Sequence, residues 1–120
     1  MTLSQADLEF FSKETKVTLG EQFSKFLIEH GYLDGDGKEL LSWLGGKESE
    51  GVKENRWCRE FYGDSFTGYI AVENDGFGNF YLVDSNDDMY FLNHENGQVA
   101  RLDKKFNEHY NKLLNEDDWE

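Results

Sequence analysis

The start of the chain places apolar and polar residues with the period of an α-helix. Ser4 followed by Asp7 has the form of an N-terminal cap, and Leu8 and Phe11 then fall three residues apart. Leu3 is placed to pack just before the cap. This pattern predicts a first helix that begins after Ser4.

A second helix is predicted over residues 19–30. Thr18-x-x-Glu21 has the form of a capping box, in which a side chain at each end satisfies a free backbone N–H of the first turn. Apolar residues then recur at helical spacing until Gly31, which can adopt the left-handed conformation that ends a helix.

The next segment repeats the cap signature and then loses its pattern. Asp36-x-x-Glu39 precedes a leucine stripe and the pair Gly45-Gly46, which predicts a short third helix. Residues 47–53 are charged and show no apolar periodicity, so we expect a surface loop there.

The middle of the chain changes to aromatic and aliphatic runs separated by Gly, Asn and Asp, which is typical of β-strands joined by turns. Because the connections are short, neighbouring strands should pair as an antiparallel meander. The expected strands cover residues 66–74, 79–84, 89–93 and 98–102.

The chain then returns to helical spacing. Asp103 can cap a last helix whose apolar positions include Phe106, Tyr110 and Leu113, and residues 116–120 form an acidic tail that is expected to fray. The whole pattern predicts one α+β domain over residues 1–120, with helices covering one face of the sheet and the last helix packed on it.

Length and composition agree with one globular core. The 120 residues contain 38% hydrophobic and 16% aromatic residues, which disfavours a disordered chain. The single cysteine, Cys58, excludes an intramolecular disulfide, and neither a secretory signal nor a membrane-spanning stretch is visible. These features predict a cytoplasmic protein.

Negative charge is concentrated in one part of the sequence. The formal net charge is -13, and eight acidic residues but no Lys or Arg lie between Arg59 and Arg101. Such a charge repels nucleic acids and anionic membranes. It has two interpretations, a solvated surface that maintains solubility or a contact surface for a basic partner.

The acidic residues near the expected turns are the candidate partner-binding residues, because loops on a rigid sheet are natural contact sites. We expect Asp87 and Asp88 to be exposed, so that Asp87→Lys with Asp88→Lys would slow association and leave thermal stability nearly unchanged. The candidates are Glu73, Asp75, Asp84, Asp87, Asp88 and Glu95.

Two acidic patterns resemble calcium sites without completing one. Asp84-x-Asn86-x-Asp88 is followed by Glu95 at the twelfth position, but Met89 stands where a sharp turn needs Gly, so an acidic hairpin turn is favoured. The repeat in residues 34–37 favours a turn followed by a helix cap. We therefore expect no metal and no cofactor.

Residues that could carry other chemistry have simpler interpretations. His94 and Glu95 are adjacent on a strand and would point to opposite faces, so a histidine bonded to its turn is favoured over an acid/base pair. The arginines beside Cys58 could lower its pKa, but a part-buried inert thiol is favoured. Gly76-Phe77-Gly78 is a turn between strands, and no phosphate site is expected.

Four aromatic residues could form an exposed ligand surface, although a core position is the commoner role of such residues in a small domain. The core interpretation is therefore favoured for all four. They are Trp43, Trp57, Tyr62 and Tyr69.

Residues 75–84, which read DGFGNFYLVD, and residues 89–95, which read MYFLNHE, resemble the SUKH superfamily. The family layout is similar along most of the chain, with N-terminal helices, an aromatic segment such as Phe61-Tyr62 and a last helix. The chain departs from the family at Leu19-Gly20, where Leu-Pro is frequent, and at Asn93, where Asp is frequent. The resemblance implies a non-enzymatic α+β module that binds another protein.

The resemblance sets the functional hypotheses. In bacteria such modules commonly neutralise a polymorphic toxin, often a nuclease, by direct binding, so we expect an immunity protein that binds a basic toxin domain. The alternatives are a regulatory protein-binding scaffold of the same superfamily and, from another class, a small hydrolase or metal-dependent enzyme. The sequence does not define the oligomeric state.

Overall fold

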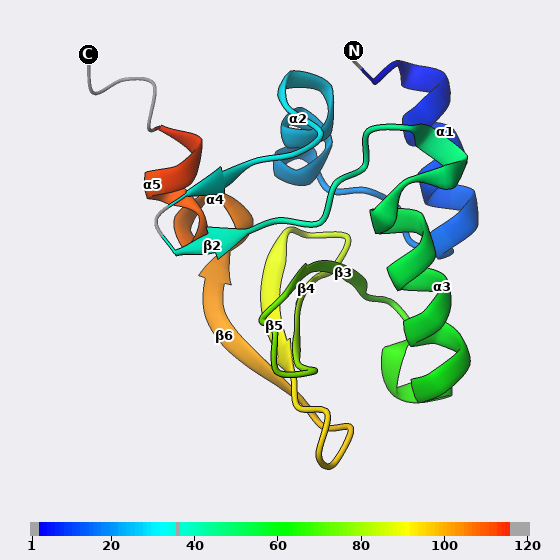
Figure 1. Cartoon of the computed structure of the whole chain (residues 1–120), viewed down its shortest axis with the longest axis vertical. Helices are drawn as coiled ribbons and strands as arrows, with labels where there is room; N and C mark the ends of the chain where they lie inside the picture. Colours follow the sequence, from blue (N-terminus) through cyan, green and yellow to red (C-terminus); the bar gives the residue numbers. More distant parts are fainter. Residues whose placement is uncertain (1–2, 36, 116–120) are drawn as a thin grey trace.

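The computed structural model describes residues 3–35 and 37–115, and Figure 1 shows its helices arranged around a central sheet. In chain order the elements are α1 (Gln5–Thr15), α2 (Glu21–Glu29), β1 (Asp34–Gly35), β2 (Lys38–Glu39), the 3-10 turn η1 (Gly46–Glu48), α3 (Glu50–Tyr62), the 3-10 turn η2 (Gly63–Phe66), β3 (Ile70–Asn74), β4 (Phe80–Val83), β5 (Asp88–Leu92), β6 (Val99–Lys105), α4 (Phe106–His109) and α5 (Asn111–Leu114). The predicted acidic tail lies outside the described residues.

The predicted meander and the α+β class are confirmed. Four strands pair antiparallel in the order β3-β4-β5-β6, joined by short turns. The predicted weak strand over 98–102 is present and longer, since β6 continues to Lys105. The first predicted strand, over 66–74, begins later than expected, because Phe66 ends η2 and β3 starts at Ile70.

The first two helices are confirmed, and the cap of the second is not. Ser4 and Asp7 form a capping box on α1, and Leu3 is buried just before it. Helix α2 ends before Gly31, whose φ is 71°. Its N-cap is Gly20, which has no side chain, so the expected capping box of Thr18 and Glu21 is wrong.

The predicted third helix is wrong. Asp34–Gly35 and Lys38–Glu39 instead pair as the two strands β1 and β2, and the chain then runs extended along the edge of β3. Leu40 bridges to Glu73, and the Leu41 N–H donates to the Val72 carbonyl at 2.8 Å. These backbone bonds stabilise the extended form, and the side chains of Leu40 and Leu41 are buried.

The predicted loop over residues 47–53 is also wrong, because α3 begins within it. The Ser49 side chain caps this helix by accepting the Val52 N–H. Asn55, which is fully buried, joins α3 to the sheet: its side-chain amide donates to the Ala71 carbonyl at 2.9 Å and its carbonyl accepts the Ala71 N–H at 2.7 Å. The helix is thereby held against β3.

The last helix does not begin at Asp103, which belongs to β6 and has a φ of 57°. Two short helices, α4 and α5, follow β6 instead. Phe106 of α4, Leu113 of α5 and Tyr110 between the two helices are buried as the predicted apolar face, and they pack on the sheet.

Both faces of β3 are covered. Ile70 and Val72 pack in the main core with α1, α2 and α4, as expected for helices on one face. Ala71 points the other way and packs in a second cluster with Cys58 of α3, so that helix lies on the opposite face. Within residues 3–35 and 37–115, none of the helices has the length and apolar character that crossing a membrane requires.

Candidate functional site

The acidic residues expected to bind a partner do not form one surface. Asp75 lies in the β3–β4 turn and Glu95 in the β5–β6 turn, at one end of the meander. Asp84, Asp87 and Asp88 lie in the β4–β5 connection at the opposite end. Antiparallel pairing imposes this separation, because successive turns alternate between the two ends of the sheet.

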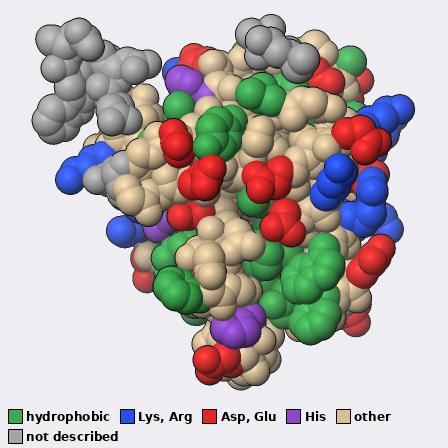
Figure 2. Space-filling view, viewed as in Figure 1, with side chains coloured by type: hydrophobic (Ala, Val, Ile, Leu, Met, Phe, Trp, Pro, Cys, Tyr) green, Lys and Arg blue, Asp and Glu red, His purple; other side chains and the backbone are tan. Residues whose placement is uncertain are grey.

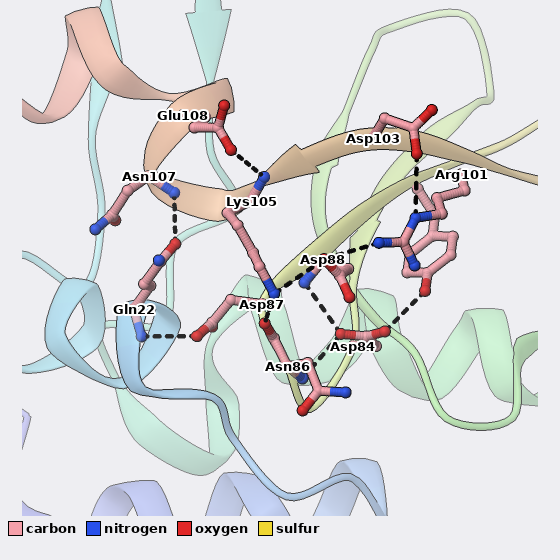
Figure 3. Close-up of polar contacts among 11 residues, drawn as sticks. Gln22, Asp84, Asn86, Asp87, Asp88, Arg101, Asp103, Lys105, Asn107 and Glu108 are labelled. Carbon is pink, nitrogen blue, oxygen red and sulfur yellow. Dashed lines mark hydrogen bonds and ion pairs between the residues drawn. The ribbon is translucent and has the colours of Figure 1, made fainter.

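At the β4–β5 turn, the carboxylate of Asp84 holds its own loop (Figure 3). Its Oδ1 accepts the N–H groups of Asn86 and Asp88 at 2.9 and 3.0 Å, and its Oδ2 accepts the Tyr90 hydroxyl at 2.8 Å. Burial, together with this hydrogen bond, raises the pKa of Tyr90 to about 12. Both carboxylate oxygens of Asp84 are therefore engaged within the protein.

Asp87 caps α2 from the same turn. Its two oxygens accept the backbone N–H groups of Gln22 and Phe23, each at 3.0 Å. A Cβ atom on Gly20 would collide with this carboxylate, so glycine is the residue that leaves room for the cap. Asp87 is 5% exposed, and the expectation that it projects into solvent is wrong.

Asp88 also has partners within the protein. Its Oδ1 lies 3.1 Å from Lys105 Nζ and 3.3 Å from Arg101 Nη2, and both bases belong to β6 (Figure 3). Only 13% of its side chain is exposed, because β6 covers it. The expectation that Asp88 is exposed is therefore wrong as well.

This geometry explains the calcium-like spacing as a turn. Asp84 and Asp88 have the partners described above, and Glu95 lies beyond the far end of β5. Among the residues that the structure describes, no group of three or more His, Cys, Asp or Glu side chains is placed to hold a metal ion.

Glu73 and Asp75 line an open groove of about 620 Å³ between the β1–β2 hairpin and the β3–β4 turn. Asp34 and Glu39 of the hairpin line the opposite side, and both are exposed. Among the described residues that line this space, four are acidic and one, Lys38, is basic. We call it the acidic groove.

Glu73 is 6% exposed, and its Oε1 accepts the hydroxyl of Tyr110 at 2.8 Å. Burial raises the pKa of this carboxyl, while Tyr110 and the charge of Lys38 act in the opposite direction. At Asp75, burial alone would raise the pKa, but hydrogen bonds from Asn79 and Phe77 outweigh it and the pKa is lowered.

The hairpin half of the acidic groove was missed because residues 34–39 were read as a turn and a helix cap. Asp34 and Glu39 are held beside β3 by the bridge between Leu40 and Glu73 and by the bond from Lys38 Nζ to the His109 carbonyl at 3.0 Å. Both contacts join segments more than thirty residues apart, and no local pattern signals them.

The groups that could carry catalysis occupy separate places. The side-chain oxygen of Asn79, at the end of the β3–β4 turn, accepts the backbone N–H of His94 at 2.9 Å and lies 2.7 Å from its Nδ1, so this histidine is bonded to the neighbouring turn rather than to its own. Cys58 is fully buried rather than part-buried, and burial raises the pKa of its thiol to about 12, which favours the expected inert thiol over a nucleophile. Both ring nitrogens of His109 are buried without a hydrogen-bond partner in the described part of the chain.

The four candidate aromatic residues divide between core and surface. Trp43 is buried, as expected, and Tyr62 and Tyr69 are half-buried. Trp57 is 46% exposed, so the core interpretation is wrong for this residue. It stacks on Phe61, one turn later in α3, which is 65% exposed.

Comparison of the chain with models of known protein families and with curated proteins found no match to either. The resemblance to the SUKH superfamily therefore rests on residues 75–84 and 89–95 and on the layout of the chain. Any function that it implies for this protein is a proposal.

Proposed function

We propose that this protein is a non-enzymatic immunity protein that binds and neutralises a basic toxin domain. The observation that carries the proposal is the acidic groove, in which Asp34 and Glu39 from the hairpin face Glu73 and Asp75 from the sheet. Positive side chains of a partner would meet the exposed carboxylates of Asp34 and Glu39 there, with the part-exposed Asp75 opposite them. Complementary charge favours both rapid association and selection against acidic partners.

The overall charge supports the same class of partner. A net charge of -13 attracts a basic protein over a distance of about 10 Å at moderate ionic strength. Nucleases carry basic surfaces because they hold phosphates, so a nuclease toxin would fit this field. The proposal places the protein in the cytoplasm, where a cell would need protection from such an enzyme.

With the structure in hand, we revise the set of residues that we expect to contact the partner. Asp75 lines the groove and Glu95 is exposed at the same end of the meander, so both remain candidates. Glu73 also lines the groove, but it is buried and bonded to Tyr110, so its carboxylate is not free to contact a partner. Asp84, Asp87 and Asp88 hold the β4–β5 turn, α2 and β6 together. We therefore assign these three to stability and replace them with Asp34 and Glu39.

One observation favours an enzyme as the second candidate. Glu73 and His109 both have shifted pKa values, and the ring of Tyr81 lies on the groove 4.9 Å from the His109 ring. The His109 nitrogens are buried, however, and would need a rearrangement to reach a substrate. Binding requires no such change, so we place it first. The regulatory scaffold shares this binding role and differs in its partner.

Co-purification with the product of the adjacent gene tests the proposal. We expect a stable complex and stoichiometric loss of toxin activity as the protein is added. The variant Asp34→Lys with Glu39→Lys should slow association and flatten its dependence on salt, because both residues are exposed on the acidic groove.

The matched control is Glu9→Lys with Glu29→Lys, which changes the net charge equally at exposed helix positions outside the groove. It should retain most of the association rate. Equal slowing by the two double variants would assign the effect to net charge alone. A partner that is no toxin would support the regulatory scaffold.

A further inference from the structure

Two large aromatic side chains lie together on the surface of α3. The rings of Trp57 and Phe61 stack with their centroids 4.9 Å apart and their planes 7° from parallel. Their exposures of 46% and 65% are high for side chains of this size. Single exposed hydrophobic residues are common in globular proteins, whereas a stacked pair forms a contiguous apolar patch.

The patch has rigid support. Tyr62 packs edge-on against both rings, at centroid distances of 6.0 and 4.9 Å, and Phe80 of β4 lies 6.2 Å from Trp57. The paired hydrogen bonds of Asn55 with Ala71 hold this part of α3 to the sheet. A surface that is already ordered loses little conformational entropy when a partner binds.

Acidic side chains share the helix face of the pair. Glu54 precedes Trp57 by three residues and Glu50 precedes it by seven, which places all of them on one side of an α-helix. Glu50 accepts the Ser42 N–H at 3.0 Å, and the bond from Asn74 to Glu54 is long, at 3.5 Å. Glu54 therefore lies between the aromatic pair and a residue that lines the acidic groove.

The three bases of α3 all pair with acidic residues. Lys53, four residues before Trp57, is exposed and its Nζ lies 3.9 Å from Glu48 Oε2, whereas both arginines pair with α1. Arg56 Nη2 lies 2.7 Å from Glu14 Oε1 of α1, and Arg59 Nη2 lies 3.5 Å from the same oxygen. Figure 2 shows hydrophobic side chains beside the lower part of α3, acidic ones across the centre of the same view, and Lys and Arg toward its sides. The exposed rings therefore adjoin negative charge.

We infer that Trp57 and Phe61 are the docking anchor for an arginine or lysine side chain of the basic partner. This inference rests on the proposed function and names the contact. A guanidinium group that stacks on an exposed indole gains cation–π attraction, and a carboxylate three residues away, Glu54, can pair with its N–H groups. Trp is enriched among the few residues that dominate interface energy.

The negative charge around Trp57 and Phe61 distinguishes among the molecules that could bind there. A second copy of this chain also carries -13, and nucleic acids and anionic membranes are negative as well, so each would be repelled by the carboxylates around the rings. A basic protein surface can make cation–π contacts with the aromatic rings and ion pairs with the acidic residues. We therefore assign the anchor to the same partner surface that faces the acidic groove.

The first test uses a defined probe and needs no identified toxin. An amidated tetra-arginine peptide is titrated into the isotope-labelled protein, with the indole N–H signal of Trp57 as the reporter and tetra-citrulline as the uncharged control. We expect a saturable shift with arginine and little with citrulline, and Glu54→Gln should weaken the arginine effect several-fold. An unshifted Trp57 signal, or equal shifts with both peptides, would overturn the inference.

The second test uses the toxin complex once it is in hand. Trp57→Ala with Phe61→Ala should raise the Kd about tenfold or more, whereas Ile28→Ala, at a side chain 41% exposed on α2, should change it less than about twofold. An unchanged Kd in the double variant would reject the anchor and leave the proposed immunity function standing. Unfolding curves of each variant verify that the fold is retained, and Trp57→Gln with Phe61→Gln provides a polar replacement.

Discussion

The carboxylate of Asp87 accepts a hydrogen bond from the backbone N–H of Phe23 at 3.0 Å, although 64 residues separate them in the chain. The first N–H groups of a helix have no partner within it, and a residue just before the helix commonly supplies one. Here that neighbouring residue is Gly20, and a turn of the sheet supplies the cap. The stability of α2 therefore depends on the meander.

Removing this cap should destabilise the protein. We expect Asp87→Ala to lower the free energy of unfolding by about 1 to 3 kcal/mol, because two amides at the start of α2 lose their acceptor. Urea unfolding followed by circular dichroism measures the change. Glu95→Ala, at an exposed turn position, is the control and should stay within about 0.5 kcal/mol of the wild type.

The charge-reversed turn should be less stable still. Asp87→Lys with Asp88→Lys removes the cap and also places a lysine beside Arg101 and Lys105, which now pair with Asp88. The melting temperature should fall below that of Asp87→Ala. A melting temperature equal to that of the wild type would restore the expectation that both residues are free surface groups.

Gly20 and Asp87 should be energetically coupled. A methyl group at position 20 would meet the Asp87 carboxylate, so Gly20→Ala should be destabilising in the wild type and much less so when Asp87 is already Ala. A double-mutant cycle should give a coupling energy of about 1 kcal/mol or more. Additive effects would show that the carboxylate moves aside at no cost.

Asn55 should be among the most sensitive positions. Asn55→Ala leaves the N–H and the carbonyl of Ala71 without the partners they now have, in a site closed to water, and should cost about 2 to 4 kcal/mol. Amide hydrogen exchange at Ala71 reports the local effect and should accelerate beyond the change in global stability. Exchange that follows global stability alone would contradict a local role.

The stability of the protein should fall in mildly acidic solution through His109. Burial, reinforced by the charges of Lys38 and Lys104, lowers the pKa of this histidine from 6.5 to about 4. Between these values the unfolded chain binds a proton that the folded protein excludes, so the contribution of His109 is full above pH 6.5 and is lost as the pH falls toward 4.

Unfolding curves at several pH values compare the wild type with His109→Phe. The wild type should lose about 2 to 3 kcal/mol more than the variant across this interval. Glu73, whose pKa is raised, acts in the opposite direction and is present in both proteins. If the free energy of unfolding depends on pH in the same way in both proteins, protonation of His109 does not destabilise the folded protein.

Signals carried by neighbouring residues allowed much of the fold to be predicted. Ser4 and Asp7 identified the start of α1, Gly31 the end of α2, and the short polar turns the order of the strands. Helix α3 was missed because Asn55 occupies a core position of its buried face and Gly51 stands in its first turn. Gly51 is required there because a side chain would collide with Trp43.

The candidate site was harder to predict from the sequence, because the exposure of a side chain depends on the assembled fold. Asp75 and Asp87 both lie in short acidic turns, yet one lines a groove and the other is buried under α2. Leu40 and Leu41 follow an apparent cap signature, but backbone pairing with β3 holds them extended. Their local pattern does not contain that pairing.

The distant cap also bears on the order in which the chain can fold during synthesis. When the ribosome has completed residues 21–29, the residue that will cap them is still more than fifty codons away. Phe23 and Phe26 also pack on Phe106, which is made later still, so we expect this part of the core to be completed only after the β4–β5 turn has emerged. We therefore expect the domain to consolidate late in synthesis, and a chain that stalls before Asp87 to expose apolar surface of the kind that chaperones bind.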